Sequence, residues 1–171
     1  MRGFTRANSS RRRDLLFLIL FGVAFGFVEA AVVFYLRNLI HFRENYSIPH
    51  YKVLLNLGFL TFVSPAHSLL LNHRVSDVEV ARETSTIVML VCVSFLAAKR
   101  TKQRVGAFLV SFACWDLAYY LFLRIIDDWP KSLFTRDVFF LIPVTWIGPV
   151  ITPIVICIVM LALGVKLFVS D

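Results

Sequence analysis

The sequence contains none of the motifs that identify the common enzyme classes. It has no GxxxxGK[ST] loop and no GxGxxG turn, so nucleotide binding has no support. His, Glu and Asp are present and can ligate iron, copper or zinc, but no HxxH, ExxH or HExxH spacing occurs. No motif anchors a nucleophile triad. We therefore predict no metal and no other cofactor, and the absences favour a protein that is not an enzyme.

Cysteines and long polar segments are also scarce. The three cysteines, Cys92, Cys114 and Cys157, lie inside apolar blocks without CxxC spacing. We interpret them as packing residues that say nothing about the redox compartment. The stretches outside the apolar blocks are short, which leaves no room for a sizeable soluble domain.

Apolar residues are abundant and occur in blocks. They make up 58% of the 171 residues, and the mean hydropathy is +0.76. A soluble domain of this size is about 45–50% apolar. Blocks of about twenty apolar residues are typical of helices that cross a bilayer, because a helix satisfies its own backbone hydrogen bonds there. The sequence predicts an all-α fold, a polytopic transmembrane helical bundle of about five spans.

The blocks give the domain boundaries. Residues 1–14 form a basic tail, which we expect in the cytoplasm, and residues 15–171 form a single transmembrane domain. The last block, 138–169, is too long for one crossing and contains Pro143, Gly148, Pro149 and Pro153, so we expect a short interfacial or re-entrant piece and a break near 146–149. A capping box at Ser76–Glu79 is expected to begin the third span. The predicted spans are 15–36, 53–71, 77–98, 105–126 and 150–169.

The net charge of +7 does not indicate nucleic-acid binding. Lysine and arginine gather at 11–13 and 99–104, each beside an apolar block, where they contact lipid headgroups and fix orientation. The expected partner is therefore the lipid bilayer.

The first block resembles a signal peptide, because three arginines precede its apolar run and small residues flank Glu29. We expect a retained anchor instead, since the run of twenty-two residues is long enough to span. Within it, Gly22, Gly26 and Ala30 form a ridge of small residues that allows another helix to approach closely. The ridge makes a second copy of the chain, or another membrane subunit, a possible partner.

Orientation depends on residues 53–71. Five spans with a cytoplasmic N-terminus place the basic turn 99–104 outside, against the positive-inside rule. If the segment around Pro65 re-entered instead of crossing, that turn would lie inside. We favour five spans, because nineteen residues are long enough to cross.

Ionisable residues at membrane depth are hypotheses of function by default. The spans 77–98 and 105–126 form a hairpin, so the start of the first and the end of the second share a membrane face, and Glu29 joins them only in the re-entrant topology. The intramembrane polar candidates are Glu29, His67, Arg82, Glu83, Asp116 and Asp137.

Each candidate also has a structural interpretation. Arg82 is expected to neutralise Glu83 or Asp116 as a structural pair. His67, after Pro65, is typical of a satisfied core histidine, and Glu29 of a hydrogen bond to a neighbouring helix. Without a cation, Asp116 is a candidate proton carrier, because desolvation disfavours the carboxylate. With Arg82 as its partner, it is structural.

Several segments resemble one known family. They are Trp129-Pro130-x-Ser132-Leu133, Asp137-x-x-Phe140-Leu141-Ile142-Pro143-x-x-Trp146-x-Gly148-Pro149-Val150, Phe27–Arg37, Ala81-Arg82-Glu83 and Trp115-Asp116. Together they resemble a family of uncharacterised bacterial integral membrane proteins over nearly the whole chain. The resemblance implies a multi-pass protein of the bacterial inner membrane and no particular activity.

Two hypotheses of function remain open. The first is a non-enzymatic protein, either a subunit of a larger membrane complex or a small transport component. The alternative is a membrane-embedded enzyme or redox protein that binds a metal through the intramembrane His/Glu/Asp set.

Overall fold

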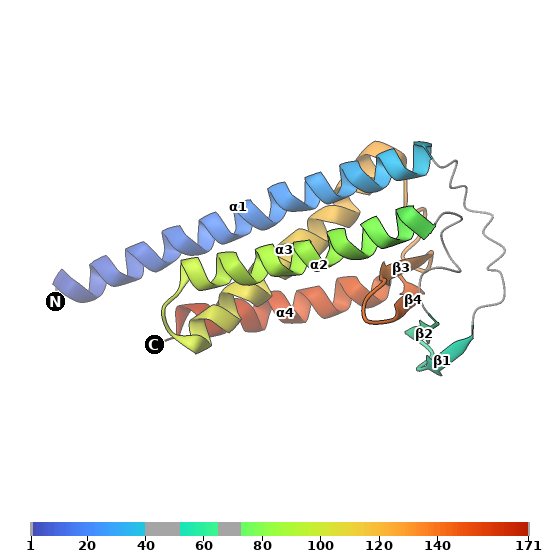
Figure 1. Ribbon diagram of the computed structural model, residues 1–171. Coiled ribbons are helices and arrows are strands. Elements are labelled where there is room, and N and C mark those ends of the chain that lie inside the picture. The colour runs from blue at the N-terminus through green and yellow to red at the C-terminus, as the bar shows by residue number, and fades with distance from the viewer. Residues whose placement is uncertain (1, 40–51, 65–72, 171) are drawn as a thin grey trace.

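The computed structural model describes residues 2–39, 52–64 and 73–170. These residues form four helices and four short strands (Figure 1). Each helix contains a segment of 19 to 28 residues that is long and apolar enough to cross a membrane. The elements are α1 (Arg2–Leu39), β1 (Val53–Asn56), β2 (Thr61–Val63), α2 (His73–Ala97), α3 (Thr101–Asp127), β3 (Arg136–Phe140), β4 (Thr145–Pro149) and α4 (Ile151–Val169).

The four helices coincide with four of the five expected spans. The expected ranges 15–36, 77–98, 105–126 and 150–169 fall in α1, α2, α3 and α4, within a residue or two. The basic tail is helical and continues into α1. The expected capping box does not begin α2, which starts at His73, and the Ser76 hydroxyl is buried without a hydrogen-bond partner in the described residues.

The expected helix over 53–71 is wrong in its described part, which is the β1–β2 hairpin. Its turn is set by two residues: Gly58 has a φ of 84°, and its N–H donates to the side-chain oxygen of Asn56 at 2.8 Å. Glycine takes this conformation without steric cost, and asparagine commonly closes such a turn. The turn ends β1 after four residues, so this apolar segment does not form a helix. Pro65 and His67 lie outside the described residues.

The purely all-α prediction is also wrong, because the described strands form one antiparallel sheet in the order β1-β2-β4-β3. The short piece expected before the last span is the β3–β4 hairpin, and the expected break at 146–149 lies in β4. Phe62 of β2 pairs with Trp146 of β4 and so joins the two hairpins. Figure 1 shows the sheet at one end of the helical bundle, opposite both chain termini.

The four candidate spans of the described residues change the expected topology. Both termini and the basic turn between α2 and α3 lie at the same end of the bundle (Figure 1). The five-span prediction had placed this turn and the N-terminal tail on opposite sides. The arrangement corresponds to the alternative in which the segment after residue 53 does not cross.

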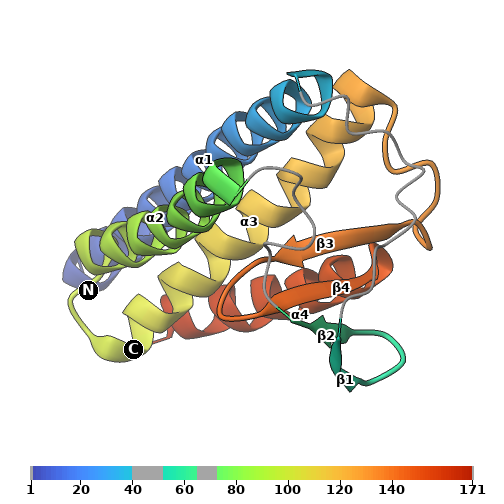
Figure 2. The ribbon, with the colours of Figure 1, turned by 45° about the vertical axis from the view of Figure 1, so that its right-hand side comes forward.

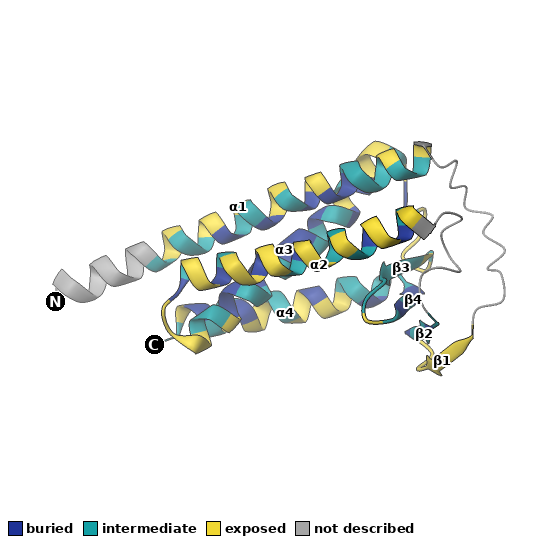
Figure 3. Ribbon diagram, viewed as in Figure 1, coloured by how far each residue is buried: buried dark blue, intermediate teal, exposed yellow. Residues whose placement is uncertain are grey.

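Helix α3 is the centre of the bundle. Half of its apolar span is buried inside the protein, against 28% or less in the other three helices. Figure 2 shows α3 between α1 and α4, and Figure 3 shows many exposed positions along the outer faces of α1 and α2. These outer faces carry large apolar side chains, among them Phe17, Val88 and Leu96, as expected for contact with lipid.

The small-residue ridge of α1 packs against α3 of the same chain. A Cβ at Gly26 would lie 2.5 Å from the carbonyl oxygen of Trp115, and one at Gly22 would lie 2.6 Å from the Cβ of Cys114. Ala30, which completes the ridge, is fully buried. The expected docking of another subunit or a second copy on this ridge is therefore wrong, because α3 already covers it.

Gly26→Val should loosen the contact between α1 and α3. The added carbons cannot fit against the α3 backbone, and overpacking of this kind costs about 1–3 kcal/mol. Ala24→Val is the matched control, since Ala24 is exposed on the same helix. Thermal unfolding in detergent should show a lower Tm for Gly26→Val alone. Equal melting of the two variants would contradict the close crossing.

Candidate functional site: a polar cluster at the sheet end of the bundle

Ionisable side chains gather in the half of the bundle next to the sheet. By the helical rise, Arg82 lies about 14 Å from the start of α2 and Asp116 about 17 Å from the end of α3. Both helix ends lie at the same end of the bundle as the sheet (Figure 1), and the hydrocarbon core of a bilayer is about 30 Å thick. The cluster therefore reaches from the sheet to about the middle of the candidate spans.

Arg82 joins α1 to α2. Its guanidinium donates to Glu29 of α1 and forms an ion pair with Glu79 of its own helix at 2.7 Å. Glu79 precedes Arg82 by three residues and so lies on the same helical face. Both carboxylates are buried. The predicted pairing of Arg82 with Glu83 or Asp116 is wrong, because these two carboxyls face other elements.

Glu83 binds the β3–β4 hairpin. Its Oε2 accepts the backbone N–H of Leu141 at 2.9 Å. Next to this bond, the Phe140 ring lies 6.2 Å from the Phe112 ring and 6.3 Å from the Trp115 ring, measured between centroids. Trp115 itself is buried in this aromatic cluster. The hairpin is therefore attached to α2 by a carboxylate and to α3 by aromatic packing.

Asp116 of α3 has a neutral partner. The Cys157 thiol of α4 donates to its Oδ2 at 3.2 Å, and Cys157 is 1% exposed. In the part of the chain that the structure describes, no cation contacts Asp116. The proposed role of Cys157 as a packing residue is therefore incomplete, because its thiol also donates a hydrogen bond to a carboxyl near the middle of a span.

Asp137 of β3 lies just outside the spans. Its Oδ2 accepts the Tyr120 hydroxyl at 2.8 Å. Burial raises the pKa of Asp137 to about 6, although this hydrogen bond and the nearby Arg37 act in the opposite direction. A carboxyl with this pKa exchanges its proton near neutral pH.

Arg37, in the last turn of α1, lies at the sheet end of the cluster. It pairs with Asp127 at 2.7 Å and lies 4.0 Å over the ring of Trp129, which itself stacks on Tyr120. A cation over an indole ring is a favourable contact. The last turn of α1 is thereby attached to the end of α3.

The carboxyls form one electrostatic group. Asp116 lies close enough to both Asp137 and Glu29 for their charges to repel, and Glu83 interacts in the same way with Glu29 and Glu79. Arg82 is the only cation that directly pairs with any of these five in the described residues. The group therefore has more acidic than basic members.

The structure brings together five of the six residues that the sequence singled out, Glu29, Arg82, Glu83, Asp116 and Asp137, while His67 lies outside the described residues. Sequence reasoning missed Glu79 and Cys157. The spacing of Glu79 and Arg82 is itself a pairing signal, but Glu79 was assigned to helix capping. In the described residues, no three His, Cys, Asp or Glu side chains are grouped so as to hold a metal ion.

Comparisons with protein-family models, curated proteins and solved structures found no match to this chain. The fold defines the class: a possible multi-pass membrane protein with four candidate spans in the described residues and a small sheet at one end.

Arg82→Ala should strongly destabilise the protein, because it leaves Glu29 and Glu79 as buried, unpaired carboxylates. The expected loss is about 3–5 kcal/mol, seen as reduced expression and aggregation in detergent. Adding Glu29→Gln and Glu79→Gln should partly restore the protein. Arg124→Ala is the matched control, since the Arg124–Asp128 pair is exposed and such pairs contribute at most about 1 kcal/mol. A well-expressed Arg82→Ala protein would contradict the bridge.

Proposed function

We propose that this protein is a small, non-enzymatic transport component of a membrane, in which Asp116 carries a proton. The observation that supports this most is the partner of Asp116. Its oxygen accepts a hydrogen bond from the Cys157 thiol, and Arg82 is occupied by Glu29 and Glu79. The structural role for Asp116 required an arginine partner, so the geometry favours the carrier role.

The other carboxyls supply a route from the sheet end to Asp116. Asp137 lies outside the spans, exchanges its proton near neutral pH, and is close enough to Asp116 to interact electrostatically. Tyr120 donates to Asp137 from α3, the helix that also carries Asp116. A proton entering at the sheet can therefore reach mid-membrane through side chains that are chemically able to hold it.

The orientation follows from the positive-inside rule. The five arginines of the N-terminal tail and the four basic residues of 99–104 lie at one end of the bundle. We therefore place this end in the cytoplasm and the sheet on the outer side. The resemblance to bacterial integral membrane proteins suggests the inner membrane, where this orientation puts Asp137 on the periplasmic side.

The proposal is tested with Asp116→Asn, which keeps the shape of the side chain and removes its ability to ionise. Purified protein is reconstituted into vesicles that contain a pH-sensitive dye, and a proton gradient is imposed. We expect proton flux with the wild-type protein and loss of most of it with Asp116→Asn. The variant should remain monodisperse in detergent, because no cation loses its partner.

Asp77→Asn is the matched control, since Asp77 is exposed near the start of α2. It should leave the flux unchanged. Aggregation of the Asp116→Asn protein would show that Asp116 has a structural role and would contradict the carrier role. A monodisperse variant with wild-type flux, or a wild-type protein without flux, would overturn the proposed function.

A further inference from the structure

A pocket opens beside the second half of α3. It has a volume of about 490 Å³ and lies between α3, the loop that precedes β3, and the start of α4. Its lining consists of Leu117, Tyr120, Leu121, Arg124, Pro130, Lys131, Ser132, Leu133 and Ile154. None of these belongs to the proposed proton route except Tyr120, whose hydroxyl is bonded to Asp137.

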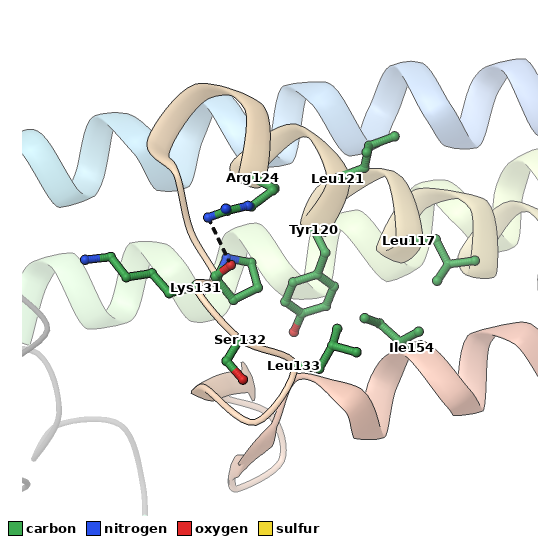
Figure 4. A pocket seen from close by; sticks show the side chains of 9 residues that line it. Leu117, Tyr120, Leu121, Arg124, Lys131, Ser132, Leu133 and Ile154 are labelled. Carbon is green, nitrogen blue, oxygen red and sulfur yellow. Dashed lines mark hydrogen bonds between the residues drawn. The ribbon is translucent and has the colours of Figure 1, made fainter.

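The pocket changes in polarity along the direction of the helices. In Figure 4, Arg124, Lys131 and Ser132 lie toward the end of α3 and its following loop, and Leu117 and Ile154 lie toward the middle of the bundle. Leu117 and Arg124 are separated by two helical turns, or about 10 Å. The pocket is thus polar where the chain leaves the candidate span and apolar deeper inside.

The charged residues at the polar end differ in whether they have an ionic partner. Arg124 is held by the carboxylate of Asp128 at 2.6 Å and by the Asp128 carbonyl at 2.8 Å, so its position is fixed by the loop. Asp127 is paired with Arg37. Lys131 is exposed and has no acidic partner in the residues that the structure describes. In the described residues, Lys131 therefore gives the mouth of the pocket a positive charge that no acidic side chain pairs with.

We propose that this pocket binds one anionic phospholipid from the leaflet on the sheet side. An acyl chain packs against Leu117, Leu121 and Ile154, and the phosphate lies at the mouth beside Lys131. The match is one of both polarity and charge: a lipid presents its anionic headgroup at the membrane surface and its hydrocarbon below, in the same order as the pocket. This site does not depend on the proposed proton transport.

Native mass spectrometry of the full chain in detergent tests the proposal. Phosphatidylglycerol and phosphatidylcholine with the same acyl chains are titrated separately. We expect one phosphatidylglycerol to bind preferentially. Lys131→Gln should weaken this binding by about fivefold, the effect of one basic residue near an anionic lipid. Leu121→Trp should reduce binding by filling the apolar part, and it should not unfold the protein because Leu121 is 58% exposed.

Lys102→Gln is the matched control, since Lys102 is exposed at the opposite end of α3, and it should bind as the wild type does. Equal binding of the two lipids would overturn the preference for an anionic headgroup. Unchanged binding in Lys131→Gln or Leu121→Trp would overturn the site. Competition by inorganic phosphate would also overturn the proposal, because it would show a site for a soluble anion.

Discussion

The structure depends on the rule that backbone polar groups inside a bilayer must be satisfied within the protein. Helices meet this rule by themselves, and an open sheet does not, because its edge strands present unpaired N–H and C=O groups. The sheet here is open at β1 and β3. The sheet is therefore expected outside the hydrocarbon, and among the described elements only the four helices are long and apolar enough to cross. This separation places both termini and the basic α2–α3 turn at one end and the sheet at the other.

The helices of the bundle are held together in two ways, by close packing at glycines and by contacts of charged side chains. The glycines of α1 and α4 let both helices approach α3 so closely that even a Cβ would collide. Helix α2 is joined differently, through the bridge from Arg82 to Glu29 and through Glu83 to the β3–β4 hairpin. Because Arg82 is used in that bridge, Asp116 is left with a thiol as its partner. The same pairing that joins α1 to α2 leaves Asp116 without a cationic partner in the described residues, which is the condition that the proposed proton-carrier role requires.

Sequence reasoning found the four helices because each is a long apolar block, and it found most of the polar cluster because charges at membrane depth are rare. It failed at 53–64, where an apolar composition outweighed the turn signal of Asn56 and Gly58. That error also changed the expected topology, and with it the relation of Glu29 to the other polar residues. The partners of Arg82 and Asp116 could not be predicted, because they depend on which faces α1, α2 and α4 turn toward one another. The ridge of Gly22 and Gly26 was correctly expected to pack closely, but the sequence does not say that the packing helix is α3.

The four-span topology is the central claim, and labelling of single cysteines tests it most directly. In a chain whose own cysteines are replaced by serine, Ser9→Cys, Lys102→Cys and Ser132→Cys are exposed separately to a membrane-impermeant maleimide in sealed, oriented vesicles. The account predicts that positions 9 and 102 react from the same side and position 132 from the other. Reaction of positions 9 and 132 from one side, with 102 on the other, would show five spans and contradict it.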